Sequence, residues 1–320
     1  MVTQTATARF RDLLKGGEIL VKPGAYNALT AKIIEAAGFK TCGVSGYAVS
    51  ATLLGKPDVG LLTGTEMVMI SRYITDAVDI PVIADADTGY GNAINVIRTV
   101  EDFIRAGVAG VHIEDQVAPK RCGHVAGKEI ISVEEAVGKY RAAAKIRDEL
   151  DPDFVLIART DARGVANGSV SDVIERGKAY LDAGADMIFP EGLVSKEELE
   201  AVTLALQCPI HFNRTGVSPM LSLKELNELG ISMVSFATGA LRCGTHAIWE
   251  FMHDFKDRDV SAQVDFLDLV KNHPVGDIHK FIGFDGVRKI EEEYLPVAKL
   301  SAKYDQSLGY LPAGSEVQGD

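Results

Sequence analysis

The sequence predicts an α/β domain of the (β/α)8 barrel class with appended C-terminal helices. Three observations support this class: short apolar runs recur eight times, a helical pattern follows each of them, and several helical patterns end at a glycine. A chain of 320 residues is long enough for such a barrel, which folds as one domain of about 250 residues. A doubly wound open sheet is the alternative. Eight units joined by short connections favour the closed barrel.

The apolar runs have the character of strands in a parallel sheet. Each run is nearly continuous in apolar residues, without strict alternation, as a strand buried on both faces requires. The predicted strands are Ile19–Val21, Thr41–Val44, Val82–Ala84, Gly110–Ile113, Phe154–Ala158, Met187–Phe189, Ile210–Phe212 and Met233–Phe236.

A predicted helix follows each strand. Four of these helices end at Ala37, Ala106, Ala183 and Leu229, and a glycine comes directly after each of the four. Glycine beyond a helix end adopts the left-handed cap conformation without steric cost. The predicted helices are Ala25–Ala37, Thr65–Ala77, Ala93–Ala106, Val133–Leu150, Ser171–Ala183, Lys196–Leu206, Leu223–Leu229 and Ala240–Asp254.

The alternation of strand and helix stops near residue 255. We therefore assign residues 1–255 to the barrel and residues 256–320 to a C-terminal helical extension. Within that extension, helical patterns lie near Val260–Asn272 and Gly286–Tyr304. We expect the extension to pack on, or exchange with, a neighbouring subunit.

The composition excludes several classes of protein. Hydrophobic residues make up 47% and charged residues 24%, which is ordinary globular usage rather than that of a disordered chain. The formal charge of −12 argues against a nucleic-acid or anionic-membrane partner. No apolar run reaches the roughly 18 residues of a membrane span, and the N-terminus has no secretory signal. Four scattered cysteines without a CxxC pair fit a reduced, cytoplasmic protein.

Polar side chains follow the predicted strands at the end where a barrel carries its chemistry. They are Asp85 and Asp87 after the third strand, Glu114 after the fourth, Arg159 after the fifth, Glu191 after the sixth and Asn213 after the seventh. A lone Asp after a strand is usually a helix cap. Asp85, Asp87 and Glu114 together instead favour a divalent cation, Mg²⁺ or Mn²⁺, because such ions prefer carboxylate oxygens.

The segment KRCGH is a second candidate for chemistry. Lys120, Arg121 and His124 surround the thiol of Cys122. Two cations and an imidazole would favour the thiolate and lower the pKa of the thiol from about 8.5. A surface loop with an incidental cysteine explains the same segment equally well.

Five strings resemble the isocitrate lyase/phosphoenolpyruvate mutase superfamily: VSGYAVSATLLGKPD, ADADTGYG, HIEDQ, PKRCGH and IARTDA. The resemblance runs from about Pro23 to His246, and KRCGH following EDQ is its most specific part. It is strongest to the branch of 2-methylisocitrate lyase, 2,3-dimethylmalate lyase and carboxyphosphoenolpyruvate phosphonomutase. It implies a (β/α)8 barrel, a Mg²⁺ ion and a homotetramer in which a C-terminal helix is exchanged between subunits.

The resemblance also implies roles for individual residues. Asp85, Asp87 and Glu114 would bind the metal, Asp87 most directly and Glu114 through water. Cys122 would be the catalytic acid or base on a mobile loop. The implied substrate contacts are Ser45, Gly46, Gly123, His124, Arg159 and Glu191, with Arg159 also counted as catalytic. The implied loop supports are Asp58, Lys120 and Arg121.

Three departures from the family pattern affect the substrate. Many lyases of this branch carry a tyrosine where this chain has Gly43, and Tyr47 either takes over that catalytic and binding role or only packs. Asn213 and Thr215 align with substrate contacts only when a gap follows them. Arg242 matches an arginine that binds a further carboxylate, or it pairs with a helix at the rim.

The leading hypothesis is a Mg²⁺-dependent carbon–carbon lyase for a small 2-hydroxy di- or tricarboxylate, such as 2-methylisocitrate or 2,3-dimethylmalate. A metal-stabilised alkoxide would collapse to an α-keto acid, and Cys122 would protonate the enediolate that leaves as the carboxylic acid. Oxaloacetate hydrolysis or decarboxylation and phosphonomutase chemistry are the alternatives within the superfamily. A non-catalytic, metal-dependent carboxylate binder is the alternative from another class.

Overall fold

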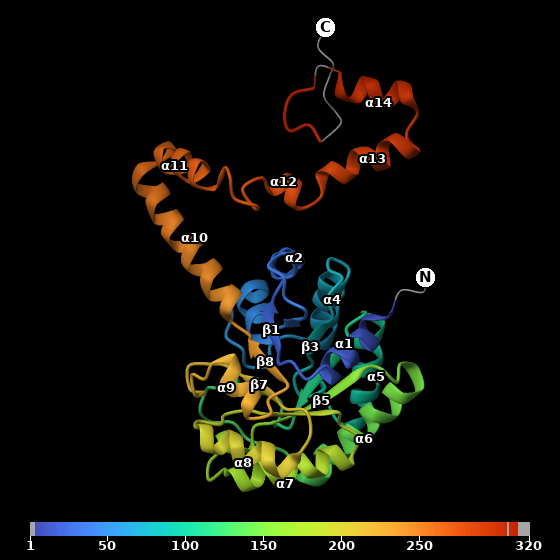
Figure 1. Cartoon of the computed structure of the whole chain (residues 1–320), viewed down its shortest axis with the longest axis vertical. Helices are drawn as coiled ribbons and strands as arrows, with labels where there is room; N and C mark the ends of the chain where they lie inside the picture. Colours follow the sequence, from blue (N-terminus) through green and yellow to red (C-terminus); the bar gives the residue numbers. More distant parts are fainter. Residues whose placement is uncertain (1–3, 306, 313–320) are drawn as a thin grey trace. The chain divides into compact units, whose positions relative to one another are not determined.

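Eight parallel strands form the centre of the first of two units into which the chain divides, Met1–Gly244 and Thr245–Asp320 (Figure 1). The structure, a computed structural model, describes residues 4–305 and 307–312. The strands are β1 (Leu20–Ala25), β2 (Cys42–Val44), β3 (Val82–Asp85), β4 (Gly110–Glu114), β5 (Val155–Thr160), β6 (Met187–Pro190), β7 (His211–Asn213) and β8 (Met233–Phe236).

The strands close into a barrel. Their order is β6-β5-β4-β3-β2-β1-β8-β7, and all neighbouring pairs are parallel. A parallel bridge between Ile188 of β6 and Ile210, directly before β7, joins the two ends of this order. The predicted (β/α)8 class is confirmed, and each predicted strand is present to within a few residues.

Helices alternate with the strands around the barrel (Figure 1). In the first unit they are α1 (Ala6–Lys15), α2 (Ala28–Ala36), α3 (Gly46–Val49), α4 (Gly64–Thr75), α5 (Ala93–Arg105), α6 (Val133–Leu150), α7 (Val170–Asp182), α8 (Lys196–Leu206) and α9 (Leu223–Glu228). A π-helical turn, η1 (Ser50–Leu54), follows α3, and a 3-10 turn, η2 (Ala162–Gly164), follows β5. The four predicted glycine caps all have positive φ, between 81° at Gly230 and 102° at Gly184.

The second unit is helical in the residues that the structure describes. Helix α10 (Gly239–Arg258) runs from the first unit into the second, and α11 (Val260–Val270), α12 (Ile278–Phe281), α13 (Phe284–Tyr294) and α14 (Val297–Tyr304) follow. The single helix predicted over Gly286–Tyr304 is wrong, because two helices are present. Leu295 between them is extended, as a residue before proline prefers, and Pro296 cannot donate the backbone hydrogen bond that a continuous helix needs.

The side chains inside the barrel change character along its axis. Near the N-terminal ends of the strands, Leu20, Val155, Met187 and Met233 share one apolar cluster with Phe10 of α1. Phe10 is completely buried, so helix α1 covers this end of the barrel. The sequence did not predict this helix.

Charged side chains follow on the same inward face of three strands. Because alternate residues of a strand share a face, Lys22 points inward like Leu20, Asp85 like Ile83, and Arg159 like Ile157. All three charged side chains are buried. The polar end of the barrel interior therefore lies toward the C-terminal ends of the strands, where a barrel enzyme carries its active site.

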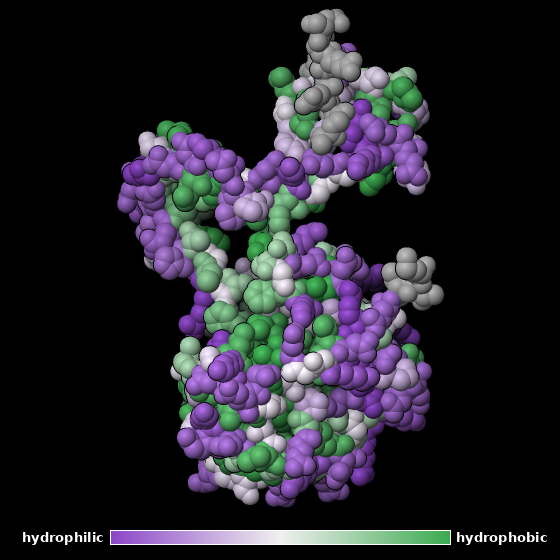
Figure 2. All heavy atoms as spheres, viewed as in Figure 1, coloured by the Kyte–Doolittle hydropathy of each residue, from purple (hydrophilic) through white to green (hydrophobic). Residues whose placement is uncertain are grey.

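Large hydrophobic side chains are exposed along the second unit (Figure 2). Ile248, Trp249, Leu267 and Leu269 are each more than half exposed. Several exposed large apolar side chains in one unit are typical of an interaction site. Separately, among the described residues no helix combines the length and the hydropathy that a membrane span requires.

Candidate active site

The turn after β3 holds Asp85 and Asp87 against the end of β2. One carboxylate oxygen of Asp85 accepts the backbone N–H of Asp87 at 3.0 Å, and the other accepts the N–H of Gly46 at 3.3 Å. A Cβ atom on Gly46 would lie 2.7 Å from that second oxygen, so only glycine permits this approach. Asp87 itself has φ of +46°, a conformation that costs energy for a residue with a side chain and is found at functional sites.

Lys120 connects the acid turn to the cysteine loop. Its Nζ atom lies 2.9 Å from an oxygen of Asp87 and 2.7 Å from an oxygen of Asp58, and all three side chains are buried. Burial raises the pKa of Asp87 to about 6, although Lys120 opposes the shift. Burial also works against the charge of Lys120, but Asp87, Glu114, Asp85 and Asp58 raise its pKa well above the usual value. Lys120 therefore stays charged and holds the loop to the acids.

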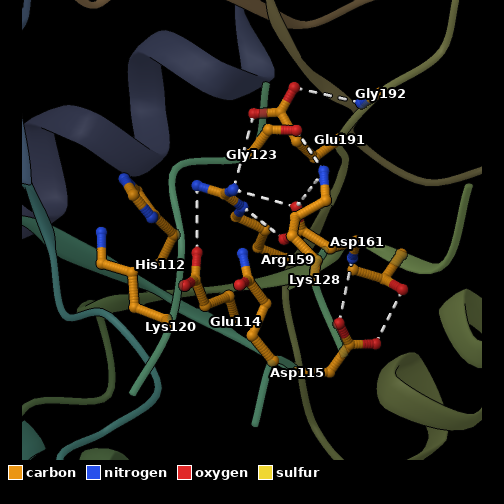
Figure 3. A network of polar contacts seen from close by, with 12 residues as sticks. His112, Glu114, Asp115, Lys120, Gly123, Lys128, Arg159, Asp161, Glu191 and Gly192 are labelled. Carbon is orange, nitrogen blue, oxygen red and sulfur yellow. Dashed lines mark hydrogen bonds and ion pairs between the residues drawn. The ribbon is translucent and has the colours of Figure 1, made fainter. Parts of the chain in front are cut away.

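Arg159 of β5 lies between three carboxylates (Figure 3). Its Nη1 atom is 3.1 Å from Glu114, its Nε atom is 2.9 Å from Asp161, and its Nη2 atom is 3.8 Å from Glu191. Asp161 is also 3.4 Å from the buried Lys128. These ion pairs fix the guanidinium plane, and they explain why the pKa of Asp161 is lowered although its burial would raise it.

A second layer of bonds fixes Asp161 from behind. Asp115 accepts the backbone N–H of Asp161 at 3.0 Å and the hydroxyl of Thr160 at 2.7 Å (Figure 3). It also accepts the hydroxyl of Tyr180 and lies 3.1 Å from the guanidinium of Arg176. Asp115 is thus a buried, fully bonded support for the position of Arg159.

The loop that carries Cys122 is anchored at both of its sides. The side-chain amide of Gln116 accepts the N–H of Arg121 and donates to its carbonyl, each at 2.9 Å. The N–H of Cys122 donates to the carbonyl of Asp58 at 3.1 Å. On the other side, Lys128 donates to the carbonyl of Gly123. The thiol is therefore held between the ion pairs that Lys120 forms with Asp58 and Asp87 and the ion pairs that surround Arg159.

Gly123 packs directly against that cluster. A Cβ atom at this position would be 2.5 Å from Nη2 of Arg159 and 2.7 Å from Cγ of Glu191. The next residue, His124, has Nε2 3.4 Å from Glu191 and Nδ1 3.3 Å from the hydroxyl of Thr215. Asn213 donates to Glu191 at 3.2 Å. The structure thus brings together the predicted substrate contacts of the loop and of β5, β6 and β7.

The thiol of Cys122 is half-buried and uncharged at neutral pH. Burial raises its pKa, and Asp58 raises it further, whereas the His124 N–H, Arg159 and Lys120 only partly oppose the shift. The thiolate suggested by the neighbouring cations in KRCGH is therefore wrong for this state of the protein. The main physical reason is the burial of the thiol, and Lys120 and Arg159 oppose it only weakly because they face carboxylates.

The predicted metal acids fit a largely hydrated cation better than a fully protein-bound one. Within residues 4–305 and 307–312, no group of three His, Cys, Asp or Glu side chains forms a ready ligand set. One buried oxygen of Asp87 and both buried oxygens of Glu114 nevertheless make no hydrogen bond, although Lys120 and Arg159 form ion pairs with the Asp87 oxygen and one Glu114 oxygen. Mg²⁺ keeps several waters and needs only one or two carboxylates. Asp85, Asp87 and Glu114 therefore have the chemistry of such a site.

Three predicted residues are not brought into this cluster. Tyr47 lies on α3 with 41% of its surface exposed, and the side chains of Arg121 and Arg242 are also exposed. Ser45 lies nearby but caps α3, where its hydroxyl accepts the N–H of Ala48. The roles predicted for these side chains stay predictions.

Several charged residues at the site were not predicted from sequence. Asp161 and Lys128 pair with each other, and His112 lies 3.5 Å from Asp85 with its pKa lowered by burial to about 3. Lys22 is buried inside the barrel. Their signal in the sequence was a polar residue within or directly after an apolar strand, which alone does not say whether the side chain points inward.

Comparisons with known proteins agree with this geometry. The model of the family described as phosphoenolpyruvate phosphomutase matches residues 10–255. The chain is 41% identical over 289 residues to 2,3-dimethylmalate lyase of Eubacterium barkeri, covering 90% of this chain and 97% of the relative.

Two solved structures add detail. Oxaloacetate acetylhydrolase in complex with 3,3-difluorooxalacetate is 36% identical, with a TM-score of 0.83, and the match covers 90% of this chain and 97% of that one. Phosphonopyruvate hydrolase in complex with oxalate and Mg²⁺ is 30% identical, with a TM-score of 0.80, and the match covers 92% of this chain and 100% of that one.

Proposed function

Because the chain belongs to the phosphoenolpyruvate phosphomutase family, we propose that it is a Mg²⁺-dependent lyase for small 2-hydroxy di- or tricarboxylic acids. The family and the 2,3-dimethylmalate lyase relative make it a carbon–carbon lyase of the isocitrate lyase/phosphoenolpyruvate mutase superfamily. The products would be an α-keto acid and a simpler carboxylic acid. Substrates of the 2-methylisocitrate or 2,3-dimethylmalate type fit this reaction.

The observation that carries the proposal is the position of the cysteine loop. Lys120 binds Asp87, and Gly123 packs on Arg159 and Glu191, so the intervening Cys122 is held beside both groups of charges. A protonated thiol next to a fixed guanidinium suits protonation of a carbanion-like fragment. A simple carboxylate binder would need the cations but no thiol.

We assign the metal site to Asp85 and Asp87, with Asp87 binding most directly and Glu114 acting through water. When bound there, the Mg²⁺ or Mn²⁺ ion supplies positive charge that favours ionisation of the substrate hydroxyl. Arg159 presents N–H donors whose direction is fixed by Glu114 and Asp161. Asn213 and His124 contact Glu191, and Thr215 contacts His124. These three side chains would orient the rest of the substrate.

In the bond-breaking step, the carbon–carbon bond next to the ionised hydroxyl breaks, and its electron pair moves to the leaving carboxylic acid as an enediolate. The Cys122 thiol gives its proton to that fragment, and after the products leave the thiolate regains a proton from water, which also takes up the proton released by the substrate hydroxyl. The hydrogen bonds of Gln116 and Lys128 hold the loop in a position that would shield the enediolate from water until it is protonated. Each role rests on groups that lie within the cluster described above.

Oxaloacetate hydrolysis or decarboxylation is the second candidate, because oxaloacetate acetylhydrolase is among the solved structures that this chain resembles. Both reactions use a carboxylate-holding arginine and a metal. Phosphonomutase chemistry is a third possibility within the family.

Measuring keto-acid release from a panel of hydroxy acids tests the proposal. The purified protein is assayed with 2-methylisocitrate, 2,3-dimethylmalate, oxaloacetate and a phosphonate, with Mg²⁺ and with EDTA. We expect turnover of a hydroxy di- or tricarboxylate that EDTA abolishes. Turnover of oxaloacetate or the phosphonate alone would contradict the lyase assignment, and binding without any turnover would indicate a carboxylate-binding protein.

A homotetramer in the cytoplasm completes the proposal. The exposed apolar side chains of the second unit support burial against other copies of this chain, and we propose that residues 256–320 pack on a neighbouring subunit. No nucleic acid or membrane partner is proposed, in keeping with the acidic charge.

A further inference from the structure

Lys22 is a buried lysine at the centre of the barrel that none of the roles assigned above uses. It lies on β1, two residues after Leu20 of the apolar interior cluster, and only 5% of its surface is exposed. Lysine is almost never this deeply buried without a partner for its charge. The chemical environment of its ammonium group therefore calls for an explanation.

The side chain of Lys22 lies inside the barrel against Gly43 of the neighbouring strand β2. A Cβ atom on Gly43 would lie 3.2–3.3 Å from Cγ, Cδ and Cε of Lys22. The missing side chain at Gly43 is therefore what leaves room for the lysine. The inward-facing Asp85 and Arg159 lie close enough to act on the pKa of the ammonium, Asp85 raising it and Arg159 lowering it.

Other buried cations at this end of the barrel have carboxylate partners. Lys120 pairs with Asp58 and Asp87, Lys128 pairs with Asp161, and Arg159 pairs with Glu114 and Asp161. For Lys22, by contrast, no hydrogen bond and no carboxylate within 4 Å is found anywhere in residues 4–305 and 307–312.

Two histidines near Lys22 do not neutralise its ammonium. His112 of β4 and His211 of β7 lie 6.2 Å apart between ring centres, and Phe189 of β6 is in contact with both rings. Burial lowers the pKa of both imidazoles, so they are uncharged at neutral pH. Burial lowers the pKa of Lys22 to about 8, while Asp85 favours its charged form, so most of the lysine is an ammonium at pH 7.

We propose that Lys22 binds a carboxylate of the substrate other than the one held by Arg159, and thereby selects substrates with at least two carboxylates. The inference rests on the proposed function, because it assumes that a hydroxy acid binds at the Asp85–Arg159 end of the barrel. The cation without a protein partner is the group that a second substrate carboxylate would complete. Arg242, the arginine expected from sequence to bind such a group, is exposed instead.

A pair of probes that differ by one carboxylate tests this role. Malate and lactate share the 2-hydroxy acid head, and only malate carries a second carboxylate. Their affinities are measured calorimetrically in Mg²⁺ for the wild-type chain and for Lys22→Met, which removes the charge but keeps much of the side-chain volume. We expect the wild type to prefer malate, and Lys22→Met to lose about tenfold or more in malate affinity with little change for lactate, as for loss of a charged hydrogen bond.

Two further variants keep the test decisive. Gly43→Val places a side chain on β2 where it would displace Lys22 of β1. It should cause the same selective loss of malate affinity, even if Lys22→Met does not fold. Lys40→Met removes an exposed lysine that pairs with Glu18, and both affinities should stay at their wild-type values. Circular dichroism and thermal unfolding confirm that each variant is folded.

The possible failures are distinguishable. A wild-type protein that binds malate no better than lactate, or variants that lose both probes equally, would overturn the role of Lys22. A wild-type protein that binds neither probe in Mg²⁺ and turns over no hydroxy acid would overturn the proposed function, and with it this inference.

Discussion

At the scale of single residues, the proposed reaction depends on Cys122 as the proton donor. The thiol is held between two groups of fixed charges, and burial raises its pKa so that it carries a proton at neutral pH. Arg159 and Glu114, by contrast, are locked together by a 3.1 Å ion pair and serve binding rather than proton transfer. Substituting these residues should therefore separate turnover from affinity.

For Cys122→Ser we expect a loss of about 10²–10⁴ in kcat, the range typical of a lost general acid, because serine is a much weaker acid than a thiol. Affinity for malate in Mg²⁺ should stay within about twofold of wild type, since the hydroxyl replaces the thiol without changing a charge. Cys243→Ser, at an exposed cysteine of α10, is the matched control with unchanged kcat. Full activity of Cys122→Ser would remove the thiol from the mechanism.

The pH dependence follows from the same thiol. The active form is the protonated thiol. Because the pKa of Cys122 is raised, the thiol stays protonated above the ordinary thiol pKa of about 8.5. We expect kcat to be level through neutral pH and to fall on an alkaline limb above that value. The residual activity of Cys122→Ser should lack this limb. Activity that instead rises through pH 7–8.5 would indicate a catalytic thiolate.

At the scale of elements, the β-strand ends and one loop create the site. Gly46 lets the end of β2 approach Asp85, and Gly123 lets the cysteine loop approach Arg159. Both contacts leave no space for a Cβ atom. A loop held this closely positions its thiol well, and a shift of about 1 Å can cost about 10²-fold in rate.

Gly123→Ala should displace the cysteine loop. Its Cβ atom would lie 2.5 Å from Arg159, so we expect kcat/KM to fall by about 10²-fold while the barrel stays folded. Gly138→Ala in α6 is the control, because its Cβ atom would meet nothing within 4 Å. That variant should keep full activity and gain about 0.4–1 kcal/mol in the free energy of unfolding. Equal activity of both variants would show that the loop contact has no role.

The sequence predicted most of the elements and the acids of the site. Apolar runs identify strands buried on both faces, and the residues after them must converge at one end of a barrel, which is why Asp85, Asp87 and Glu114 could be named together. Side-chain direction could not be predicted in the same way. Ser45 begins a helix and turns Tyr47 toward solvent, and the inward direction of Lys22 depends on where β1 starts.

The contacts that the cysteine loop makes with other parts of the site could not be predicted from the sequence either. The bonds from His124 to Glu191 and Thr215 depend on the path of the loop, which no local pattern fixes. The raised pKa of Cys122 also depends on folding, which buries the thiol. Its neighbours Lys120 and Arg159 are cations in the sequence, but folding pairs them with Asp87 and Glu114.

At the scale of the whole molecule, the second unit exposes several large apolar side chains, which favours their burial against another chain. Trp249 on α10 is 62% exposed and Leu269 on α11 is 79% exposed. An acidic side chain at either position should oppose burial against another copy of the chain, because an unpaired buried charge is strongly unfavourable.

Sedimentation equilibrium of Trp249→Glu tests this expectation. The wild-type chain should have the mass of a tetramer, and the variant should dissociate toward smaller species at the same concentration. Leu204→Glu places the same charge at a leucine of α8 that is 68% exposed in the first unit, and we expect it to leave the mass unchanged. A wild-type chain that sediments as a monomer would contradict the proposed assembly.

The most direct test of the whole account is a crystal structure grown with Mn²⁺ and malate, with anomalous scattering used to locate the metal. We expect one manganese peak beside the Asp85 and Asp87 carboxylates, with Glu114 within reach through water and malate between the ion and Arg159. A peak at another place, or Asp85, Asp87 and Glu114 turned away from any common ion, would contradict this expectation.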